Sequence, residues 1–393
     1  MSESFHIEVY HEEKPHEGER ICGDRFVSRR VGEEGRIVAV LSDGLGHGVK
    51  ANILATLTSS MALNFTIEHK DPVRIAEVIM NTLPVDDERK ISYATFTIVD
   101  IEINGDVSIL EYDNPQAIVM RGHELFMPQW QCIIMEGENR GKELRYCRFK
   151  PQKEDRIIFS SDGVTQSGLG TDAYPLGWGE DNLRRFVAET IGNQPDISAD
   201  KLCQRLITKA AKNDGYASKD DTSCAVIYFR KPRRLLICTG PPFKKEKDKE
   251  LAREVRDFKG KKIISGATTA DIISRELKLE IEDGFEFEDP DLPPVSYMEG
   301  IDLLTEGILT LSKVAELLKV YDHKTRLRKG PADQIVQMLR ESDEVNFIIG
   351  TRINIAHQDP NLPVELEIRR TVVKRIAALL QDKFFKDVNI KYI

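Results

Sequence analysis

Residues 36–65 change pattern abruptly within a few positions. The run RIVAVLSD (36–43) is apolar and strand-like, whereas VKANILATLTSSMALNF (49–65) repeats its apolar residues at helical spacing. Between the two runs stands an aspartate followed by Gly-Leu-Gly-His-Gly. A tight strand-to-helix turn uses such glycines, and so does a metal site that needs bare backbone close to the ion. The junction alone leaves both interpretations open.

Residues 1–230 consist mostly of strand-like runs with a few helical runs between them. Asn104-Gly105, the strongest short-range hairpin signal, lies between two β-rich runs within 91–114. Asp71 and Pro72 predict the N-cap and first position of a helix over 71–83. The other predicted elements are strands at 117–127, 155–163 and 222–230 and helices at about 180–190 and 198–213. This pattern predicts an α+β fold, a two-sheet β-sandwich flanked by helices.

The segment KPRR (231–234) predicts a boundary between a domain at 1–231 and a smaller domain at 232–393. Two domains suit 393 residues, which are too many for one ordinary core. The second block alternates strand, glycine turn and helix, which predicts an α/β domain. Residues 297–320 predict a core helix preceded by a loop. The last predicted helix, near 363–385, has one apolar face with Val364, Ile368, Val372, Ile376 and Leu379.

Composition limits the classes of function. The net charge of −9 argues against a general affinity for nucleic acid or for an anionic membrane. No segment approaches the roughly 18 uninterrupted apolar residues of a membrane span, and the N-terminus lacks the pattern of a secretory signal. The six cysteines form no CxxC pair, so we expect reduced, buried thiols. We therefore expect a cytoplasmic protein.

Four short stretches of the first block place an aspartate beside a glycine, or in an Asp-Asp pair, at a predicted strand end. They are CGDRF (Asp24), LSDGLGHG (Asp43), SSDGVT (Asp162) and SKDDTS (Asp220 and Asp221). Each is an ordinary turn when taken alone. As a set they suit Mg²⁺ or Mn²⁺, which prefer oxygen ligands. Two such ions roughly 3.5–4 Å apart need one bridging carboxylate and a few terminal ones.

The order and wording of these motifs resemble the metal-dependent protein phosphatases of type 2C (the PPM family), in the bacterial branch named for stage II sporulation protein E (SpoIIE). The resemblance covers about residues 15–230. It rests on five motifs in family order: CGDRF, SDGLGHG, YDNPQAIVMRG, FSSDGVTQS and DDTSCAVI. It implies that residues 1–231 are a phosphatase domain acting on phosphoserine or phosphothreonine of a regulatory protein.

Carried onto this sequence, the resemblance implies two Mn²⁺ or Mg²⁺ ions that share the carboxylate of Asp43, with the Gly44 carbonyl as a further ligand. In the implied mechanism a hydroxide bridging the metals attacks phosphorus, so no side-chain nucleophile is needed. The junction at residue 43 would then be a metal turn. The remaining implied metal carboxylates, followed by a supporting one, are Asp24, Asp162, Asp220 and Asp221.

The proton donor is less defined. Much of the wider family has a histidine directly after the Asp-Gly pair, but Leu45 stands there and His47 follows two residues later, as in many bacterial relatives. His47 either protonates the leaving seryl oxygen or simply packs at the helix start. Arg20 and Arg25 flank the first acidic motif and are either phosphate ligands or ordinary surface residues.

In the second block, Gly266, Thr268 and Thr269 lie between a predicted strand and a predicted helix. Free N–H groups and hydroxyls at a helix start hold anions, although threonine is also a common helix cap. The GxGxxG and GxxxxGK[ST] patterns are absent, so neither a dinucleotide nor a P-loop nucleotide is indicated. A small ligand, a partner protein and homodimer formation all remain open as roles for this domain.

Three functions remain open for the whole chain. The first is a metal-dependent serine/threonine phosphatase with a C-terminal regulatory domain. The second is an inactive signalling scaffold with the same fold, and the third is a sensor whose C-terminal domain binds a small anion. A decayed site would usually have lost at least one carboxylate. All four are present, which favours the first function.

Overall fold

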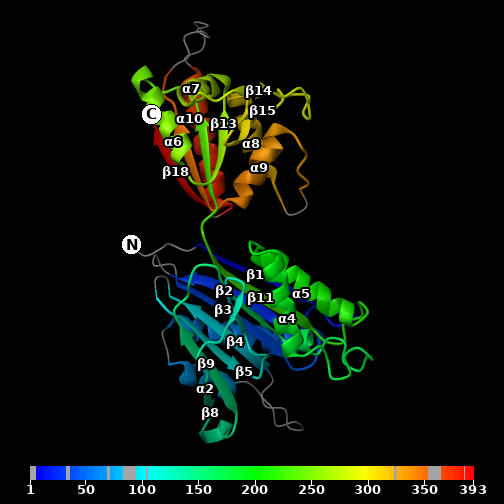
Figure 1. The fold of residues 1–393 in the computed structure, drawn as a ribbon. Coiled ribbons are helices and arrows are strands. Elements are labelled where there is room, and N and C mark those ends of the chain that lie inside the picture. The colour runs from blue at the N-terminus through cyan, green and yellow to red at the C-terminus, as the bar shows by residue number, and fades with distance from the viewer. Residues whose placement is uncertain are drawn as a thin grey trace. The chain divides into compact units, whose positions relative to one another are not determined.

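The computed structural model describes residues 6–31, 36–68, 71–82, 94–102, 105–322, 325–352, 364–384 and 386–393. The chain divides into two compact units, Met1–Lys231 and Pro232–Ile393. Each unit has its own sheets and its own apolar cores (Figure 1).

The N-terminal unit is built around two antiparallel sheets. Apolar side chains of both, among them Leu41 and Ile227, form the core between them. This arrangement confirms the predicted sandwich. The five-stranded sheet has the order β1 (His6–Lys14), β11 (Thr222–Arg230), β10 (Asp155–Ser160), β6 (Ile118–Arg121) and β7 (Glu124–Phe126). The six-stranded sheet has the order β2 (Arg25–Val31), β3 (Arg36–Gly44), β4 (Ala94–Ile101), β5 (Val107–Tyr112), β9 (Glu143–Phe149) and β8 (Gln131–Ile134).

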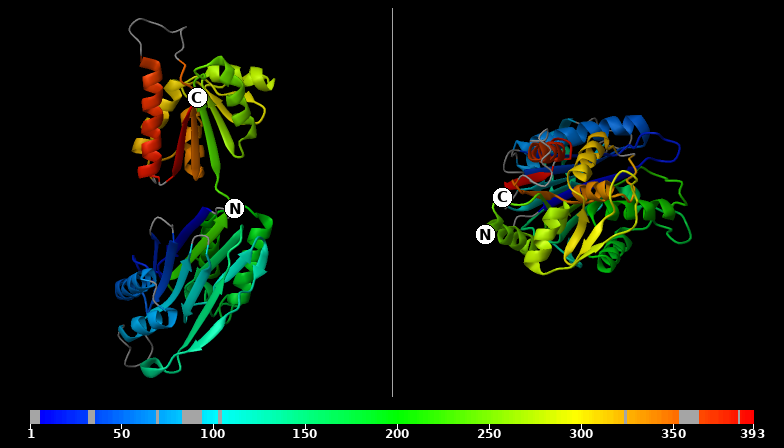
Figure 2. Two further views of the ribbon diagram at one scale, coloured as in Figure 1. Left: turned by 90° about the vertical axis from the view of Figure 1, so that its left-hand side faces the viewer. Right: turned by 90° about the horizontal axis from the view of Figure 1, so that it is seen from above.

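Helices cover the outer face of each sheet (Figure 2). Residues of α1 (Gly48–Ile67) and α2 (Pro72–Thr82) pack on the six-stranded sheet. Residues of α4 (Glu180–Asn193) and α5 (Ala199–Asn213) pack on the five-stranded sheet. Two shorter elements are α3 (Asp162–Thr165) and the 3₁₀ turn η1 (Gly137–Asn139).

The start of α2 is capped as the sequence predicts. Oδ1 of Asp71 accepts hydrogen bonds from the backbone N–H groups of Val73 and Arg74, at 3.0 and 3.2 Å. These bonds satisfy N–H groups that have no acceptor within the helix. The expected hairpin also forms, between β4 and β5, although Asn104 and residues 91–93 lie outside the described residues.

Two strand predictions need correction. Residues 117–127 form a hairpin rather than one strand, because β6 and β7 pair antiparallel across Gly122, whose φ is 62°. A single glycine within an apolar run is too weak a signal to predict such a turn from sequence. Residues 155–163 are extended only as far as Ser160, and Asp162 begins the short helix α3.

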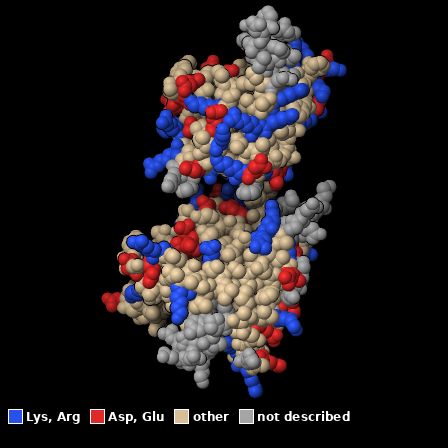
Figure 3. Space-filling model, turned by 180° about the vertical axis from the view of Figure 1, so that it is seen from behind, with Lys and Arg blue, Asp and Glu red and all other residues tan. Residues whose placement is uncertain are grey.

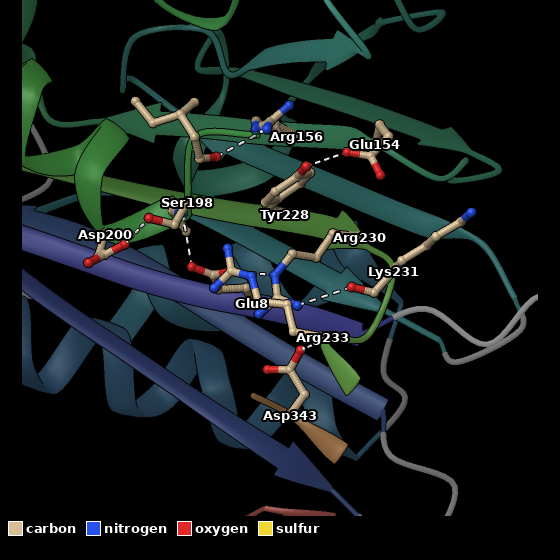
Figure 4. Close-up of polar contacts among 12 residues, drawn as sticks. Glu8, Glu154, Arg156, Ser198, Asp200, Tyr228, Arg230, Lys231, Arg233 and Asp343 are labelled. Carbon is tan, nitrogen blue, oxygen red and sulfur yellow. Dashed lines mark hydrogen bonds and ion pairs between the residues drawn. The ribbon is translucent and has the colours of Figure 1, made fainter. Parts of the chain in front are cut away.

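The strands β1 and β11 lie side by side although they come from opposite ends of the unit. Figure 4 shows Glu8 of β1 accepting a hydrogen bond from Nε of Arg230 in β11, at 2.6 Å. The other carboxylate oxygen of Glu8 accepts the N–H of Ala199, the first residue of α5. Next to them, the fully buried Arg156 lies over the ring of Tyr228, 3.6 Å from its centroid. Strand β11 begins at Thr222, next to Asp220, and ends at Arg230. These contacts therefore hold together the end of the five-stranded sheet that is opposite to Asp220.

The C-terminal unit contains one seven-stranded sheet with helices on both faces, which confirms the predicted α/β class. Five parallel strands follow the spatial order β16 (Ile301–Thr305), β13 (Lys261–Ser265), β12 (Arg234–Thr239), β17 (Glu344–Ile349) and β18 (Asp387–Tyr392). In chain order this is 3-2-1-4-5, a doubly wound sheet. The antiparallel strands β15 (Ser296–Met298) and β14 (Ile281–Asp283) extend the β16 edge.

The helices divide between the two faces of this sheet. One core contains side chains of α8 (Ile308–Val320), α9 (Pro331–Glu341) and α10 (Val364–Asp382). The opposite core contains side chains of α6 (Asp248–Asp257) and α7 (Ala267–Leu277). A 3₁₀ turn, η2 (Lys245–Lys247), precedes α6.

Two predictions for this unit differ from the structure. The core helix predicted within 297–320 forms only from Ile308 onward, as α8. The residues before it form the β15–β16 hairpin, where the sequence predicted a loop and the start of the helix. On α10, Val373, Ile376 and Leu380 are fully buried, whereas Val372 and Leu379 are only partly buried. The predicted apolar face is therefore rotated by about one residue. The side chain of Val364 lies outside the described residues.

Charged side chains of both signs are interspersed over the face that Figure 3 shows. Of the described helices, none combines the length and the apolar character needed to cross a membrane. The six cysteines are all free, and Cys132 alone among them is exposed.

Candidate metal centre

Asp24 and Asp43 lie at one end of the six-stranded sheet. Asp43 is the last residue but one of β3, and Asp24 immediately precedes the neighbouring strand β2. The register pairs Arg25 with Ser42, which brings the two aspartates together, and their carboxyl groups are in contact. Asp24 is only 1% exposed.

Asp162 and Asp220 lie at one end of the five-stranded sheet. Ser161 joins the end of β10 to the start of β11, since its N–H donates to the Ser223 carbonyl at 3.0 Å and its Oγ accepts the Ser223 N–H at 3.0 Å. The residues just beyond these strand ends therefore emerge together. Asp220 Oδ1 accepts the N–H of Asp221 at 2.8 Å.

Glycines show how closely these segments approach one another. A Cβ atom on Gly23 would lie 2.4 Å from Oδ2 of Asp221, and one on Gly163 would lie 2.0 Å from the Asp221 carbonyl oxygen. A Cβ atom on Gly44 would lie 2.1 Å from the carbonyl oxygen of Ala51 in α1. Glycine is thus required at Gly44 and Gly163 by the approach of another backbone, and at Gly23 by the approach of the Asp221 carboxylate. The junction at residue 43 is a tight strand-to-helix turn in its own right, whether or not a metal binds.

Burial raises the pKa of each of the four candidate ligands, and the charge of a nearby carboxylate adds to the increase. Burial raises the pKa of Asp24 to about 7, against the lowering effect of the Ser161 and Ser223 hydroxyls. The pKa of Asp43 is raised well above its ordinary value, first by burial and then by the charges of Asp24, Asp162 and Asp220. Two carboxylates this close do not both ionise readily, so they hold protons that a cation would replace.

The pKa values of Asp162 and Asp220 are raised as well. Burial raises the pKa of Asp162, while its hydrogen bond with Asp43 lowers it. Burial and the charge of Asp162 raise the pKa of Asp220 to about 6. Asp43 thus faces carboxyl groups from both sheets, which is the position that a shared ligand would need.

The donor set fits hard divalent cations in its chemistry. Both carboxylate oxygens of Asp24 and Oδ2 of Asp221 are buried with no well-formed hydrogen bond. Such oxygens are costly unless a proton or a cation compensates them. Within the described ranges, however, no group of three or more His, Cys, Asp or Glu side chains is arranged so that it could hold a metal ion as it stands.

His47 lies beside this cluster and is the residue immediately before α1. Its Nδ1 lies 3.0 Å from Oε1 of Glu19, and its ring stacks on that of His16 with 4.5 Å between centroids. Its side chain is 53% exposed, so it does not simply pack inside the helix start. His16 is tied to the cluster in turn, because its backbone N–H donates to Oδ1 of Asp221 at 3.0 Å.

Sequence reasoning missed Glu19, His16 and the two serines, Ser161 and Ser223. Each of these residues contacts a segment more than 25 residues away in the sequence, so no local pattern could predict the contact. Asn114 of the YDNPQA motif is buried and donates from Nδ2 to Thr97 Oγ1 at 3.0 Å.

Two further predicted residues of the N-terminal unit lie on its surface. Arg20 and Arg25 are both exposed. In the C-terminal unit, Gly266 precedes α7, and Thr268 and Thr269 lie in its first turn.

Part of the chain is similar to known proteins. The family model described as stage II sporulation protein E (SpoIIE) matches residues 33–230. A Bacillus subtilis structure of the SpoIIE PP2C phosphatase domain with a fragment of its regulatory domain is 16% identical, with a TM-score of 0.47, over 58% of this chain and 64% of that one. The present chain therefore spans less than two thirds of that protein. The search of curated proteins found no match.

Two further solved structures are similar over the same part. The RsbU and RsbW domains of a Mycobacterium tuberculosis protein are 17% identical, with a TM-score of 0.45, over 65% of this chain and 68% of that one. A serine/threonine phosphatase of S. agalactiae is 16% identical, with a TM-score of 0.41, over 57% of this chain and 99% of that one. Because the family model covers half of the sequence, the chain belongs to the SpoIIE family of phosphatase domains.

Proposed function

We propose that the protein is a metal-dependent serine/threonine protein phosphatase whose C-terminal unit regulates it. The observation that carries the proposal is the convergence of Asp24, Asp43, Asp162 and Asp220 from two sheets into one cluster, in which Asp24 is buried and the other three are half-buried. A cluster of carboxyl groups with raised pKa values is unstable without compensation and serves a functional need. Membership of the SpoIIE family agrees with a phosphatase.

In this proposal the aspartates hold two Mn²⁺ or Mg²⁺ ions, with Asp43 between them and the Gly44 carbonyl and Asp221 in support. When bound, such ions lower the pKa of water and neutralise charge on a phosphoryl group. The protein supplies a rigid frame for the ligands, because Asp24 and Asp43 extend from paired strands and Ser161 clamps the opposite pair.

His47 supplies the proton for the leaving seryl or threonyl oxygen. Glu19 accepts a hydrogen bond from its Nδ1, which orients the ring and leaves Nε2 for proton exchange with substrate. The side chain is 53% exposed, which supports access by a phosphorylated segment of another protein. The substrate we propose is accordingly a phosphorylated regulatory protein.

The test is hydrolysis of a phosphoserine peptide by the full chain with Mn²⁺, with Mg²⁺ and with chelator, comparing wild type with Asp43→Asn. We expect metal-dependent turnover that the substitution abolishes, with Asp181→Asn, an exposed carboxylate on α4, as the unaffected control. Near-normal turnover by Asp43→Asn would overturn the proposal.

The alternative is an inactive scaffold with the same fold. It is favoured by the absence, in the described part of the chain, of a group already arranged to hold a metal. Wild-type protein that gains no stability from either cation and hydrolyses nothing would select this alternative.

A further inference from the structure

Two helix starts meet at one edge of the sheet in the C-terminal unit. Gly266 precedes α7 and Gly307 precedes α8, and these helices follow the neighbouring parallel strands β13 and β16. The two glycines are adjacent, because a Cβ atom on Gly307 would lie 3.5 Å from the Cα of Gly266. We call Gly266, Thr269, Gly307 and Thr310 the two-helix cradle.

Each helix places a threonine at its third position, and both hydroxyls lack a partner. Thr269 and Thr310 are each 1% exposed, and no hydrogen bond reaches Oγ1 of either. Threonines in a helix usually satisfy this group by bonding to a carbonyl one turn back. A buried hydroxyl left unpaired is costly, which indicates that something else satisfies it when the protein functions.

The Thr269 hydroxyl is directed into the space between the two helix starts. A Cβ atom built on Gly266 would meet only two atoms, Oγ1 of Thr269 at 3.7 Å and the Cα of Gly307 at 3.8 Å. These are ordinary contact distances, so the point beside Gly266 is open to an atom. Ala267 and Thr268, at the start of α7, are exposed, and the space is therefore reached from solvent.

The neighbouring backbone holds the two turns together. Gly266 N–H donates to the Thr305 carbonyl at 2.8 Å, and Ser265 Oγ lies 2.9 Å from the Glu306 carbonyl oxygen. Their relative placement is thus fixed before any ligand arrives. A site fixed in this way loses little conformational entropy when it binds.

The charge distribution of the two-helix cradle favours an anion. The first N–H groups of a helix have no partner within the helix, and its N-terminus carries partial positive charge. Two such ends meet here, and the buried Thr269 hydroxyl is directed between them. At the end of the next strand, β12, the guanidinium of Arg369 lies beside Gly240, since a Cβ atom there would be 2.6 Å from its Nη1. The two-helix cradle lies at the carboxyl ends of the strands, the end of a doubly wound sheet at which ligands bind, although their usual place is the switch point, here between β12 and β17.

We propose that the two-helix cradle binds a phosphoryl group, either free phosphate or the phosphate of a small metabolite. Several donors pointing inward from different directions match the oxygens of a tetrahedral phosphoryl group better than a planar carboxylate. The proposal extends the residues singled out by sequence, Gly266, Thr268 and Thr269, by a second helix that the sequence pattern did not indicate. It is independent of whether the N-terminal unit is an active phosphatase.

The test is amide hydrogen exchange of the full chain with inorganic phosphate, in chelator and at constant ionic strength with chloride as the reference salt. We expect phosphate to slow exchange at residues 267–269 and at 308–310. Thr269→Val should weaken phosphate binding about tenfold or more, because a charge-assisted hydrogen bond is lost. The control is Ser274→Ala, which removes a hydroxyl at the other end of α7.

A second variant and a second ligand sharpen the result. Thr310→Val should weaken phosphate binding in the same way, and both valine variants should melt no lower than wild type, because the hydroxyl they remove has no partner. A nucleoside monophosphate that protects these residues at lower concentration than phosphate would identify a phosphoester as the ligand, and equal protection would identify phosphate itself. Protection absent from both helix starts, or unchanged in both valine variants, would overturn the proposal.

Discussion

Nδ1 of His47 lies 3.0 Å from Oε1 of Glu19, and this pair stands beside the aspartate cluster of the N-terminal unit. A carboxylate only accepts hydrogen bonds, so Nδ1 carries the hydrogen and Nε2 remains for exchange with substrate. Stacking on His16 restricts the ring further. This geometry leaves Nε2 of His47 available, as the proposed role of proton donor requires.

We expect His47→Gln to lower kcat for a phosphoserine peptide by about a hundredfold or more, the usual contribution of a general acid. An aryl phosphate, whose leaving group needs no proton, should be affected far less. Glu19→Gln should lower kcat less than His47→Gln, since it disturbs only the orientation of the ring. The matched control is His123→Gln, an exposed histidine of the β6–β7 turn. Equal losses for both substrates would exclude proton donation by His47.

The raised pKa values predict how stability depends on pH in chelator. Asp24, with a pKa of about 7, and Asp220, with a pKa of about 6, keep their protons on folding at pH values where the unfolded chain has released them. The folded state then binds more protons, so their contribution to stability is lost as pH rises from about 4 to about 7. Urea denaturation at several pH values measures this slope. Asp24→Asn should flatten it, and a slope unchanged in that variant would contradict the assignment.

The contact of Gly44 with α1 predicts a large effect from one methyl group. Gly44→Ala places Cβ 2.1 Å from the Ala51 carbonyl oxygen, so the strand end or the helix must shift, at a cost of about 1–3 kcal/mol or more. Gly192→Ala is the opposite case, because no atom lies within 4 Å of its Cβ position and it stands in α4. That variant should gain about 0.4–1 kcal/mol. Equal unfolding free energies for the two variants in chelator would show that the β3–α1 contact is not tight.

The sequence predicted the sandwich and the positions of the aspartates relative to its strands, because both follow from local patterns. Apolar runs mark the strands, continuous ones in β3, β10 and β11, and each Asp stands beside one end of such a run. It did not predict why glycine follows Asp43, since the answer is the backbone of Ala51, which approaches only in three dimensions. Glu19 was missed for the same reason.

The C-terminal unit shows a different limit. Residues 297–320 contain helical spacing near their end, and this pattern obscured the short strands β15 and β16 before α8. The start of α8, and with it Gly307 and Thr310, was therefore not recognised as a partner for Gly266. Strands of three to five residues carry too few alternations to define a period.

The most direct test of the aspartate cluster is calorimetric titration of the full chain with Mn²⁺, for wild type, Asp43→Asn and the control Asp181→Asn. The account predicts about two ions for wild type and for the control, and loss of binding in Asp43→Asn, because the carboxylate shared by both ions is gone. Binding by Asp43→Asn with wild-type stoichiometry and affinity would contradict the account, as would wild-type protein that binds no Mn²⁺.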